Sequence, residues 1–205
     1  MGRYSRRILG VCLGIMFLCQ PVFAADLSQF FMTVHTLSGQ FTQIVKDRHG
    51  HVVTRGGGQL WVARPGRFRW NYVKPYKEQI VGSGRSVWLY DPGLAQATRY
   101  TVNQALGRTP ALLLAGDGHL HRLFHILNLG TYDGLHWLRL TPKGLGQGFR
   151  WIRVGYLGPH IHRIVLRDAL GQTTYIRLFS VILNHPLPQS LFKFQPPPHT
   201  AIVSE

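Results

Sequence analysis

The feature that most constrains this chain is an alternation of apolar and polar side chains with a period of two, which covers most of the chain after residue 40. Such alternation is typical of strands that bury one face of a sheet. Short clusters of Gly, Pro, Asp and Ser separate the alternating runs and predict hairpin-length turns, which join antiparallel strands. The pattern predicts a mainly β protein of about ten or eleven strands. The predicted strands cover residues 41–46, 59–64, 68–73, 79–82, 87–90, 97–102, 135–141, 149–156, 160–167, 173–183 and 191–194.

Several segments break the alternation and predict short helices. Apolar residues recur at helical spacing over residues 26–37, which predicts a short amphipathic helix. Residues 104–107 and 109–115 do not alternate, and the second segment predicts a compact apolar helix with Pro110 near its first turn. Residues 119–124 predict a further short turn. With so little helix in the chain, these apolar helices are expected to lie over the concave side of the sheet.

The first 24 residues predict a cleaved secretory signal peptide. Three arginines precede an apolar run at residues 8–18, and residues 22–24 offer small side chains at the cleavage positions. The run is shorter than the roughly 20 residues that span a membrane. The residue before Cys19 is Leu18, whereas a lipidation site has a small residue there. The sequence therefore predicts that residues 25–205 form one exported domain in the periplasm.

The charge of the chain restricts the function classes it can serve. The chain holds 23 Lys and Arg against 8 Asp and Glu, a formal charge of +15, and loss of the arginines in the signal leaves +12. So few carboxylates disfavour paired-carboxylate catalysis and calcium binding. Both cysteines, Cys12 and Cys19, lie in the signal segment, and Ser83 and Ser86 lie outside any nucleophile-elbow pattern. We expect no enzymatic activity and no cofactor.

One face of the predicted sheet carries unusually large apolar side chains. Leu60 and Val62 share one face of their strand, and Phe68, Trp70 and Tyr72 share one face of the next strand. This face is either the packed core of a barrel or sandwich, or the lining of a concave sheet that short helices cannot fill, which leaves a cavity for a lipid. The residues expected to add to the same interior are Val87, Leu89, Phe149, Trp151, Tyr175, Phe179 and Val181.

Arg64 ends the first of these strands, on the same face as Leu60 and Val62. A guanidinium beside an apolar lining is unfavourable unless its donors find acceptors. In one interpretation, Arg64 reaches past the end of the strand into water. In the other, Arg64 is a latch that holds the backbone carbonyls of a lid helix until a ligand displaces it.

The run LWVARPGRFRW at residues 60–70 resembles the signature of the LolA family, the periplasmic outer-membrane lipoprotein carrier proteins. Other segments match the family in order and spacing, so that the resemblance spans nearly the whole chain after the signal. The matching segments are SGQFTQ at 38–43, DP at 91–92, QAT at 96–98, TP at 109–110, LLLA at 112–115, LRLTPK at 138–143 and FKFQPP at 192–197.

The resemblance implies an incomplete antiparallel β-barrel with a helical lid over a hydrophobic cavity. It implies that the protein accepts acylated lipoproteins from an inner-membrane lipoprotein-releasing ABC transporter and delivers them to the outer-membrane receptor LolB. By position, Arg64 matches the lid latch, residues 110–115 match the lid, and Phe68 matches a residue at the cavity mouth that contacts the transporter. The implied ligand-binding residues are Leu60, Val62, Arg64, Phe68, Trp70, Tyr72, Leu89, Leu112, Leu114 and Ala115.

The alternative is an exported lipid-binding or polyanion-binding protein of related fold without a lipoprotein-transfer role. Trp61, Trp70 and Trp88 with nearby arginines resemble a base-stacking platform, but export makes nucleic acid an unsuitable partner and none is predicted. The 11 histidines have neither a cysteine nor an acidic cluster beside them, so we predict no metal site. The expected oligomeric state is a monomer.

Overall fold

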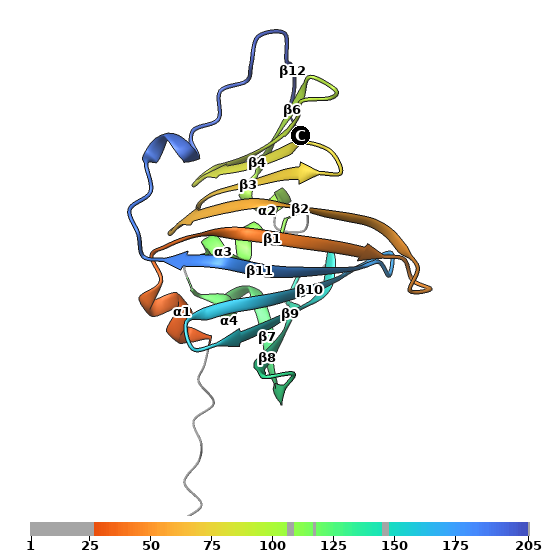
Figure 1. Cartoon of the computed structure of the whole chain (residues 1–205), viewed down its shortest axis with the longest axis vertical. Coiled ribbons are helices and arrows are strands. Elements are labelled where there is room, and N and C mark those ends of the chain that lie inside the picture. The colour runs from red at the N-terminus through yellow and green to blue at the C-terminus, as the bar shows by residue number, and fades with distance from the viewer. Residues whose placement is uncertain (1–26, 106–108, 117, 145–147, 205) are drawn as a thin grey trace, which may run out of the picture.

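The computed structural model describes residues 27–105, 109–116, 118–144 and 148–204. The predicted signal peptide at residues 1–24 lies outside the described residues, so its cleavage stays a prediction. Figure 1 shows one strongly curved sheet with short helices behind its central strands. Among the described residues, no helix is both long enough and apolar enough to cross a membrane.

Within the described residues, twelve strands form one sheet in the order β12-β6-β5-β4-β3-β2-β1-β11-β10-β9-β8-β7. Neighbouring strands are antiparallel except β12 and β6, which pair in parallel. The mainly β, antiparallel prediction is therefore confirmed, although the predicted number of strands is too low. The strands are β1 (Thr36–Lys46), β2 (Val52–Ala63), β3 (Arg67–Lys74), β4 (Glu78–Ser83), β5 (Ser86–Asp91), β6 (Gln96–Thr101), β7 (Phe124–Tyr132), β8 (Leu135–Pro142), β9 (Phe149–Leu157), β10 (His160–Asp168), β11 (Thr173–Leu183) and β12 (Ala201–Ser204).

The structure differs from the sequence-based predictions of these elements at three places. Residues 191–194 do not form the predicted strand: Leu191 and Phe192 belong to the 3-10 helix η1 (Gln189–Phe192), where Leu191 N–H donates to the carbonyl of Pro188 at 3.1 Å. After the prolines at 196–198 the chain continues into β12, where no strand is predicted. Strand β7, most of which carries no prediction, forms the edge of the sheet opposite β12.

The predicted helices are present but short. They are α1 (Ser28–Thr33), α2 (Val102–Ala105), α3 (Ala111–Ala115) and α4 (Leu120–Leu123). All five residues of α3 are buried, and α3 packs against β2 and β3 on the concave side of the sheet. A helix that is apolar on every side is stable only when protein surrounds it. The expectation that apolar helices cover the concave side is therefore confirmed.

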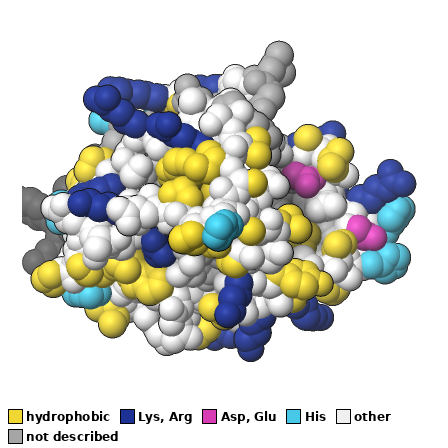
Figure 2. Space-filling model, turned by 90° about the horizontal axis from the view of Figure 1, so that it is seen from above, with side chains coloured by type: hydrophobic (Ala, Val, Ile, Leu, Met, Phe, Trp, Pro, Cys, Tyr) yellow, Lys and Arg dark blue, Asp and Glu magenta, His cyan; other side chains and the backbone are white. Residues whose placement is uncertain are grey.

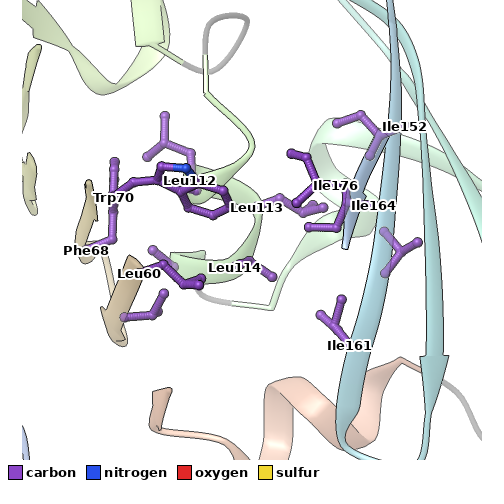
Figure 3. Packing of buried hydrophobic residues seen from close by; sticks show 14 of the residues in the cluster. Leu60, Phe68, Trp70, Leu112, Leu113, Leu114, Ile152, Ile161, Ile164 and Ile176 are labelled. Atoms are coloured by element: carbon purple, nitrogen blue, oxygen red, sulfur yellow. The ribbon is translucent and has the colours of Figure 1, made fainter. Parts of the chain in front are cut away.

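The core lies between the concave side of the sheet and these helices. Figure 3 shows side chains of β2 and β3 facing α3, with side chains of β9, β10 and β11 on the other side of α3. Leu60 pairs with Trp70 across the two strands, and Val62 pairs with Phe68, so all four side chains share one face. Leu60 and Phe68 are 0% exposed and Trp70 is 1% exposed. The predicted interior face is therefore correct for β2 and β3.

The prediction of the interior face is wrong for Trp151, Tyr175 and Phe179. Their neighbours Ile152 and Ile176 are buried, so alternation along β9 and β11 places these aromatic rings on the convex side. Tyr175 is 43% exposed and Phe179 is 36% exposed. Phe149 and Val181 do pack against the core, as predicted, because the strand register shifts beside each of them. A bulge adds one residue and so exchanges the two faces.

The C-terminal segment crosses the convex side of β3, β4 and β5 before it joins the sheet as β12 (Figure 1). Arg69 on β3 donates through Nε to the carbonyl of Leu191 at 2.6 Å. The ring of Phe194 lies 5.3 Å from that of Trp88 and 5.5 Å from that of Tyr90. This segment therefore packs against the convex side of β3, β4 and β5.

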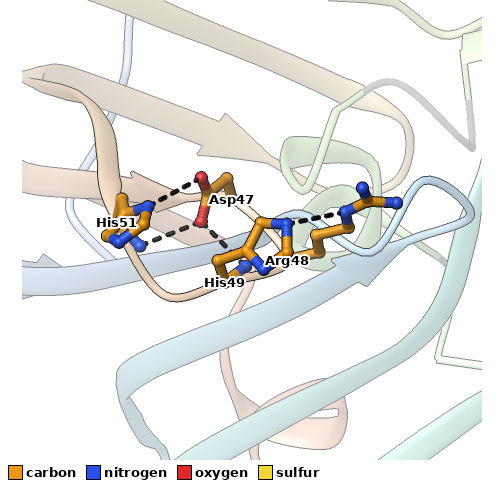
Figure 4. A network of polar contacts seen from close by, with 4 residues as sticks. All are labelled: Asp47, Arg48, His49 and His51. Atoms are coloured by element: carbon orange, nitrogen blue, oxygen red, sulfur yellow. Dashed lines mark hydrogen bonds and ion pairs between the residues drawn. The ribbon is translucent and has the colours of Figure 1, made fainter.

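The predicted hairpin turn at residues 47–50 joins β1 and β2. Oδ1 of Asp47 accepts hydrogen bonds from the backbone N–H groups of His49 and His51 at 2.8 and 2.9 Å (Figure 4). Desolvation by itself raises the pKa of the Asp47 carboxyl, but these backbone hydrogen bonds and the nearby His51 outweigh it and lower the pKa. The carboxylate thereby fixes the turn and, with it, the register of the two strands.

Replacement of Gly82 on β4 by alanine should disrupt this core. A Cβ atom at Gly82 lies 2.2 Å from the ring of Phe68, which is fully buried and cannot move aside. We expect Gly82→Ala to lower the free energy of unfolding by about 1–3 kcal/mol, measured by urea denaturation.

The neighbouring exposed Ser83 supplies the control, since Ser83→Ala should change the free energy of unfolding by less than about 0.5 kcal/mol. Adding Phe68→Leu to Gly82→Ala should recover part of the loss. If Gly82→Ala lowers the free energy of unfolding equally in the Phe68 protein and in the Phe68→Leu variant, a clash with the Phe68 ring is not the cause.

Candidate functional site

The candidate site centres on Arg64, which follows the last residue of β2 and turns toward the helices on the concave side. Nε of Arg64 donates to the carbonyl of Gly116 at 2.9 Å. Nη1 donates to the carbonyls of Phe31 and Val34 at 2.7 and 2.8 Å, with a longer contact to Phe30 at 3.4 Å. Arg64 is half-buried, and its donors are used by protein carbonyls. The interpretation in which Arg64 simply reaches into water is therefore wrong.

The acceptors of Arg64 lie at the C-terminal ends of two different helices. The last carbonyls of a helix have no partner within the helix and need donors from elsewhere. Phe31 and Val34 lie at the end of α1, and Gly116 directly follows α3. The planar guanidinium presents several N–H groups in fixed directions, so that one side chain serves both helix ends. Arg64 thereby joins the two helices to the end of β2.

Aromatic rings complete the surroundings of the guanidinium. Cζ of Arg64 lies 4.6 Å from the ring centroid of Phe31 and 5.7 Å from that of Phe30. A guanidinium within about 6 Å of a ring centroid gains a cation–π attraction. Gly118, at a φ of +88°, passes so close that a Cβ there would lie 3.0 Å from Cβ of Phe31. The backbone after α3 therefore requires glycine beside the Arg64 side chain.

Two backbone hydrogen bonds hold the same region together. Gly66 N–H, in the turn after Arg64, donates to the carbonyl of Ala115 at 2.7 Å. The N–H of Arg64 itself donates to the carbonyl of His35 at 2.9 Å. The turn between β2 and β3 thus contacts α3 through its backbone as well as through the guanidinium. Release of α3 from the sheet requires the hydrogen bonds from Gly66 to Ala115 and from Arg64 to Gly116 to break together.

The predicted ligand-binding residues surround this latch. Leu60, Val62, Phe68 and Trp70 are buried on the concave face, and Leu89 packs against them in part. Leu112, Leu114 and Ala115 are buried in α3, which lies over that face. Tyr72 lies at the far end of β3, where its hydroxyl donates to Oε1 of Gln43 at 3.0 Å. Burial, together with the charge of Glu78, raises the pKa of Tyr72.

Among the described residues, side chains of the helices fill most of the space predicted as a hydrophobic cavity under a helical lid. The pocket that remains between α3, α4 and β9 has a volume of about 40 Å³. The helices fill the concave side because their own apolar residues take the place of a ligand. Phe68, expected at the mouth of the cavity, is fully buried for the same reason.

One buried polar atom on the concave face has no partner. Nε1 of Trp70 has no hydrogen-bond acceptor among the described residues. An unsatisfied buried donor destabilises a fold by about 1–3 kcal/mol. Trp70 therefore carries an indole N–H on the concave face that makes no hydrogen bond of standard geometry with the described residues. Across the described part of the chain, no group of His, Cys, Asp or Glu side chains is placed to hold a metal ion.

Sequence reasoning missed the partners of Arg64. It assigned only residues 110–115 to the lid, whereas α1 supplies the acceptors Phe31 and Val34, and Gly116 lies just outside the assigned segment. The adjacent Phe30 and Phe31 are the signal that could have indicated α1. Two neighbouring residues cannot both face the core from one helix, so the second ring needs another contact, and in the structure Arg64 supplies it. No local pattern marks backbone carbonyls as acceptors.

These features define a class of protein before any comparison with others. An open, curved antiparallel sheet carries an apolar concave face, and short apolar helices cover that face. One arginine side chain holds the helices in place. The class is that of an open curved sheet whose apolar concave face is covered by the protein's own short helices.

The family of the chain follows from its sequence relatives. The model of the family "Outer membrane lipoprotein carrier protein LolA" matches residues 32–195. The outer-membrane lipoprotein carrier protein of Dechloromonas aromatica is 36% identical over 206 residues, which covers 100% of this chain and 99% of that protein. The carrier protein of Methylococcus capsulatus is 38% identical and covers 91% and 90% of the two chains. The chain belongs to the LolA family, whose members are periplasmic carriers and not enzymes.

Solved structures support the fold. A LolA superfamily protein from Nitrosomonas europaea superimposes with a TM-score of 0.51 at 14% identity, over 82% of this chain and 96% of that chain. An uncharacterized conserved protein from Thermus thermophilus superimposes with a TM-score of 0.53 at 14% identity, over 87% and 96% of the two chains. These similarities show that the curved, helix-covered sheet is a LolA-like fold.

Lysine at position 64 should loosen the helices without unfolding the sheet. A lysine keeps the charge but has a single nitrogen, which cannot reach Gly116 and α1 at once in the fork geometry of arginine. We expect Arg64→Lys to speed hydrogen exchange of the amides in α1 and α3 by about tenfold, as charged hydrogen bonds of about 1.5–3 kcal/mol are weakened. Mass spectrometry of the exchanged protein measures this effect.

The control is Arg85→Lys, in the exposed turn between β4 and β5. It should leave exchange in α1 and α3 unchanged. Equal exchange in the two variants would contradict a latching role for Arg64.

Proposed function

We propose that this protein carries acylated lipoproteins across the periplasm, from an inner-membrane lipoprotein-releasing ABC transporter to the outer-membrane receptor LolB. The observation that carries the proposal is the fork of hydrogen bonds from Arg64 to α1 and to Gly116. This fork gives the apolar concave face a cover that can be released without breaking the sheet. Family membership supports the same cargo, since the relatives are lipoprotein carriers by name.

The physical need for such a carrier comes from the acyl chains of the cargo. Each CH₂ group contributes about 0.8 kcal/mol on leaving water, so one long chain contributes on the order of 10 kcal/mol. Free passage through water is therefore negligible, and an apolar protein surface has to replace the bilayer. The proposed surface consists of Leu60, Val62, Phe68, Trp70, Tyr72 and Leu89 on the sheet and Leu112, Leu114 and Ala115 on α3.

Loading requires the helices to move, because a pocket of about 40 Å³ cannot hold an acyl chain. The helices and the cargo then compete for the same apolar face. When the cargo leaves, the helices close over the same apolar face and regain its burial. This gain offsets part of the binding free energy of the cargo, so the cargo can be released. A receptor that binds the cargo better by about 1.4 kcal/mol then receives it with a tenfold preference.

Trp70 and Phe68 have more specific proposed roles. An ester or amide carbonyl of the cargo is a suitable acceptor for Nε1 of Trp70, which has none among the described residues. Phe68 lies near the start of β3, close to the turn that contains Arg64. At this end of the concave face, release of α3 exposes Phe68 before Trp70 and Tyr72. We assign Phe68 to the contact with the transporter in the open state.

The remaining proposals concern the state of the protein in the cell. A signal peptide at residues 1–24 directs export, and residues 25–205 act as a single domain in the periplasm. The carrier works as a monomer and needs no cofactor, because transfer involves no bond-making step.

Leucine at position 64 should trap the cargo. Without the hydrogen bonds of Arg64, the helices no longer compete for the concave face, so cargo stays bound. We expect Arg64→Leu to load normally and to pass cargo to the receptor at least about tenfold more slowly, because the charged hydrogen bonds to Gly116, Phe31 and Val34 are lost. A transfer assay with purified carrier and receptor measures both steps, and Arg85→Leu is the control. Normal transfer by Arg64→Leu would refute the latch.

The cargo itself should be recoverable from the protein. We expect protein purified from the periplasm to release acylated lipoprotein or free acyl chains into organic solvent, identified by mass spectrometry. The yield should fall when apolar lining is replaced by charge, as in Leu114→Glu, relative to the exposed-surface change Leu94→Glu. Retained oligonucleotide in place of lipid, with strongly salt-dependent binding, would instead support the polyanion-binding alternative.

A further inference from the structure

The convex side of β8, β9, β10 and β11 carries a group of arginines that the carrier function does not use. We call it the convex arginine face, and it consists of Arg139, Arg153, Arg163, Arg167 and Arg177. Strand register brings these residues together, although they are far apart in sequence. Arg139 pairs with Arg153 across β8 and β9, and Arg163 pairs with Arg177 across β10 and β11. The same side chains alternate with buried neighbours, so all of them lie on the side away from the core.

One row of this face runs from the edge strand β7 to β2. It begins at Leu127, passes through the paired arginines Arg139 and Arg153, and ends at Arg55. Between them, cross-strand pairing continues from Arg153 to Val165, Tyr175 and Ile44. Cationic and apolar side chains therefore lie side by side along a line perpendicular to the strands.

Trp151 holds the two central arginines in place. Cζ of Arg153 lies 4.6 Å from its ring centroid, and Cζ of Arg139 lies 6.0 Å from it. The Nε atoms of both arginines are buried and have no hydrogen-bond partner among the described residues. The ring of Trp151, and not an acceptor at Nε, thus positions the two guanidinium groups on this side of the sheet.

The protein supplies almost no negative charge to this face. Asp133 forms an ion pair with Arg163, and it is the one acidic partner that the described residues offer to the five arginines. The imbalance extends over the molecule, since Lys and Arg are abundant and acidic side chains sparse in the view of Figure 2. Like charges brought together without counter-charges destabilise a fold, so their clustering indicates a negatively charged partner.

The face is open to such a partner. The C-terminal segment covers the convex side of β3, β4 and β5, which is the other half of the sheet. Exposed apolar side chains accompany the arginines here, including Leu127 at 56% exposure and Tyr175 at 43%. Interspersed cations and single apolar side chains are typical of surfaces that rest on anionic bilayers.

We infer that the convex arginine face binds the surface of an anionic phospholipid bilayer. The arginines are spread over four strands in a broad convex array and are not gathered in a notch. Mobile lipid headgroups can move to each guanidinium of such an array, whereas the fixed carboxylates of a protein have to match every position at once. Binding by this face turns the helices on the concave side away from the bilayer, where they stay free to open.

The test measures binding of the exported protein to vesicles by co-sedimentation. We expect binding to vesicles with about 30 mol% phosphatidylglycerol in phosphatidylcholine, no binding to pure phosphatidylcholine, and loss of binding at about 0.5 M NaCl. The double variant Arg153→Gln/Arg177→Gln should lower the partition coefficient by about thirtyfold, at about fivefold for each arginine near the surface.

The matched control is Arg85→Gln/Arg122→Gln, which removes the same charge from exposed positions outside the face. It should lower the partition coefficient less than about threefold. If the first variant unfolds, Arg163→Gln/Arg177→Gln changes two exposed residues of the face and should give the same large loss. Equal losses in face and control variants would overturn the proposal, as would no binding to the anionic vesicles. Slower cargo transfer by the face variants without vesicle binding would also overturn it, in favour of an acidic protein partner.

Discussion

The structure depends on one interaction, the set of hydrogen bonds from a permanently charged arginine to the backbone carbonyls of two helix ends. Arg64 contacts Gly116 after α3 and Phe31 and Val34 at the end of α1. Arginine does not lose its charge at any pH that a cell reaches, so these hydrogen bonds are not broken by titration. In the proposed function they break when cargo competes with the helices for the apolar surface beneath them.

The covered surface explains why the interior is nearly full. A curved sheet with a large apolar concave face gains free energy when that face leaves water, whatever covers it. In this structure α3 covers it, with all five residues buried and a residual pocket of about 40 Å³. The proposed cargo replaces the protein's own helices and not water, so the net affinity is smaller than the area of contact suggests. In the two proposals, opposite sides of one sheet serve different partners: the concave side binds acyl chains, and the convex arginine face binds a bilayer.

How far the sequence predicts this arrangement differs between the two halves of the sheet. In β2 and β3, alternation alone places Leu60, Phe68 and Trp70 correctly on the interior face. In β9 and β11 the same reasoning fails for Trp151 and Tyr175, because it ranks large aromatic rings as interior while the smaller Ile152 and Ile176 form the core. The candidate site follows the same division. Arg64 can be selected from its position in the motif, but its acceptors are main-chain atoms that have no sequence signature.

By itself, the sequence determined the strand periodicity, the positions of most turns, the apolar character of α3 and the family to which the chain belongs. These are local properties, set by the spacing of side chains along a few residues or by the order of motifs. Tertiary structure alone decided that the concave side is filled, that α1 shares the latch, and that five arginines from four strands lie together on the convex side. Those outcomes depend on how neighbouring strands are aligned and on where bulges occur. A register shift of one residue moves every side chain of a strand to the other face of the sheet.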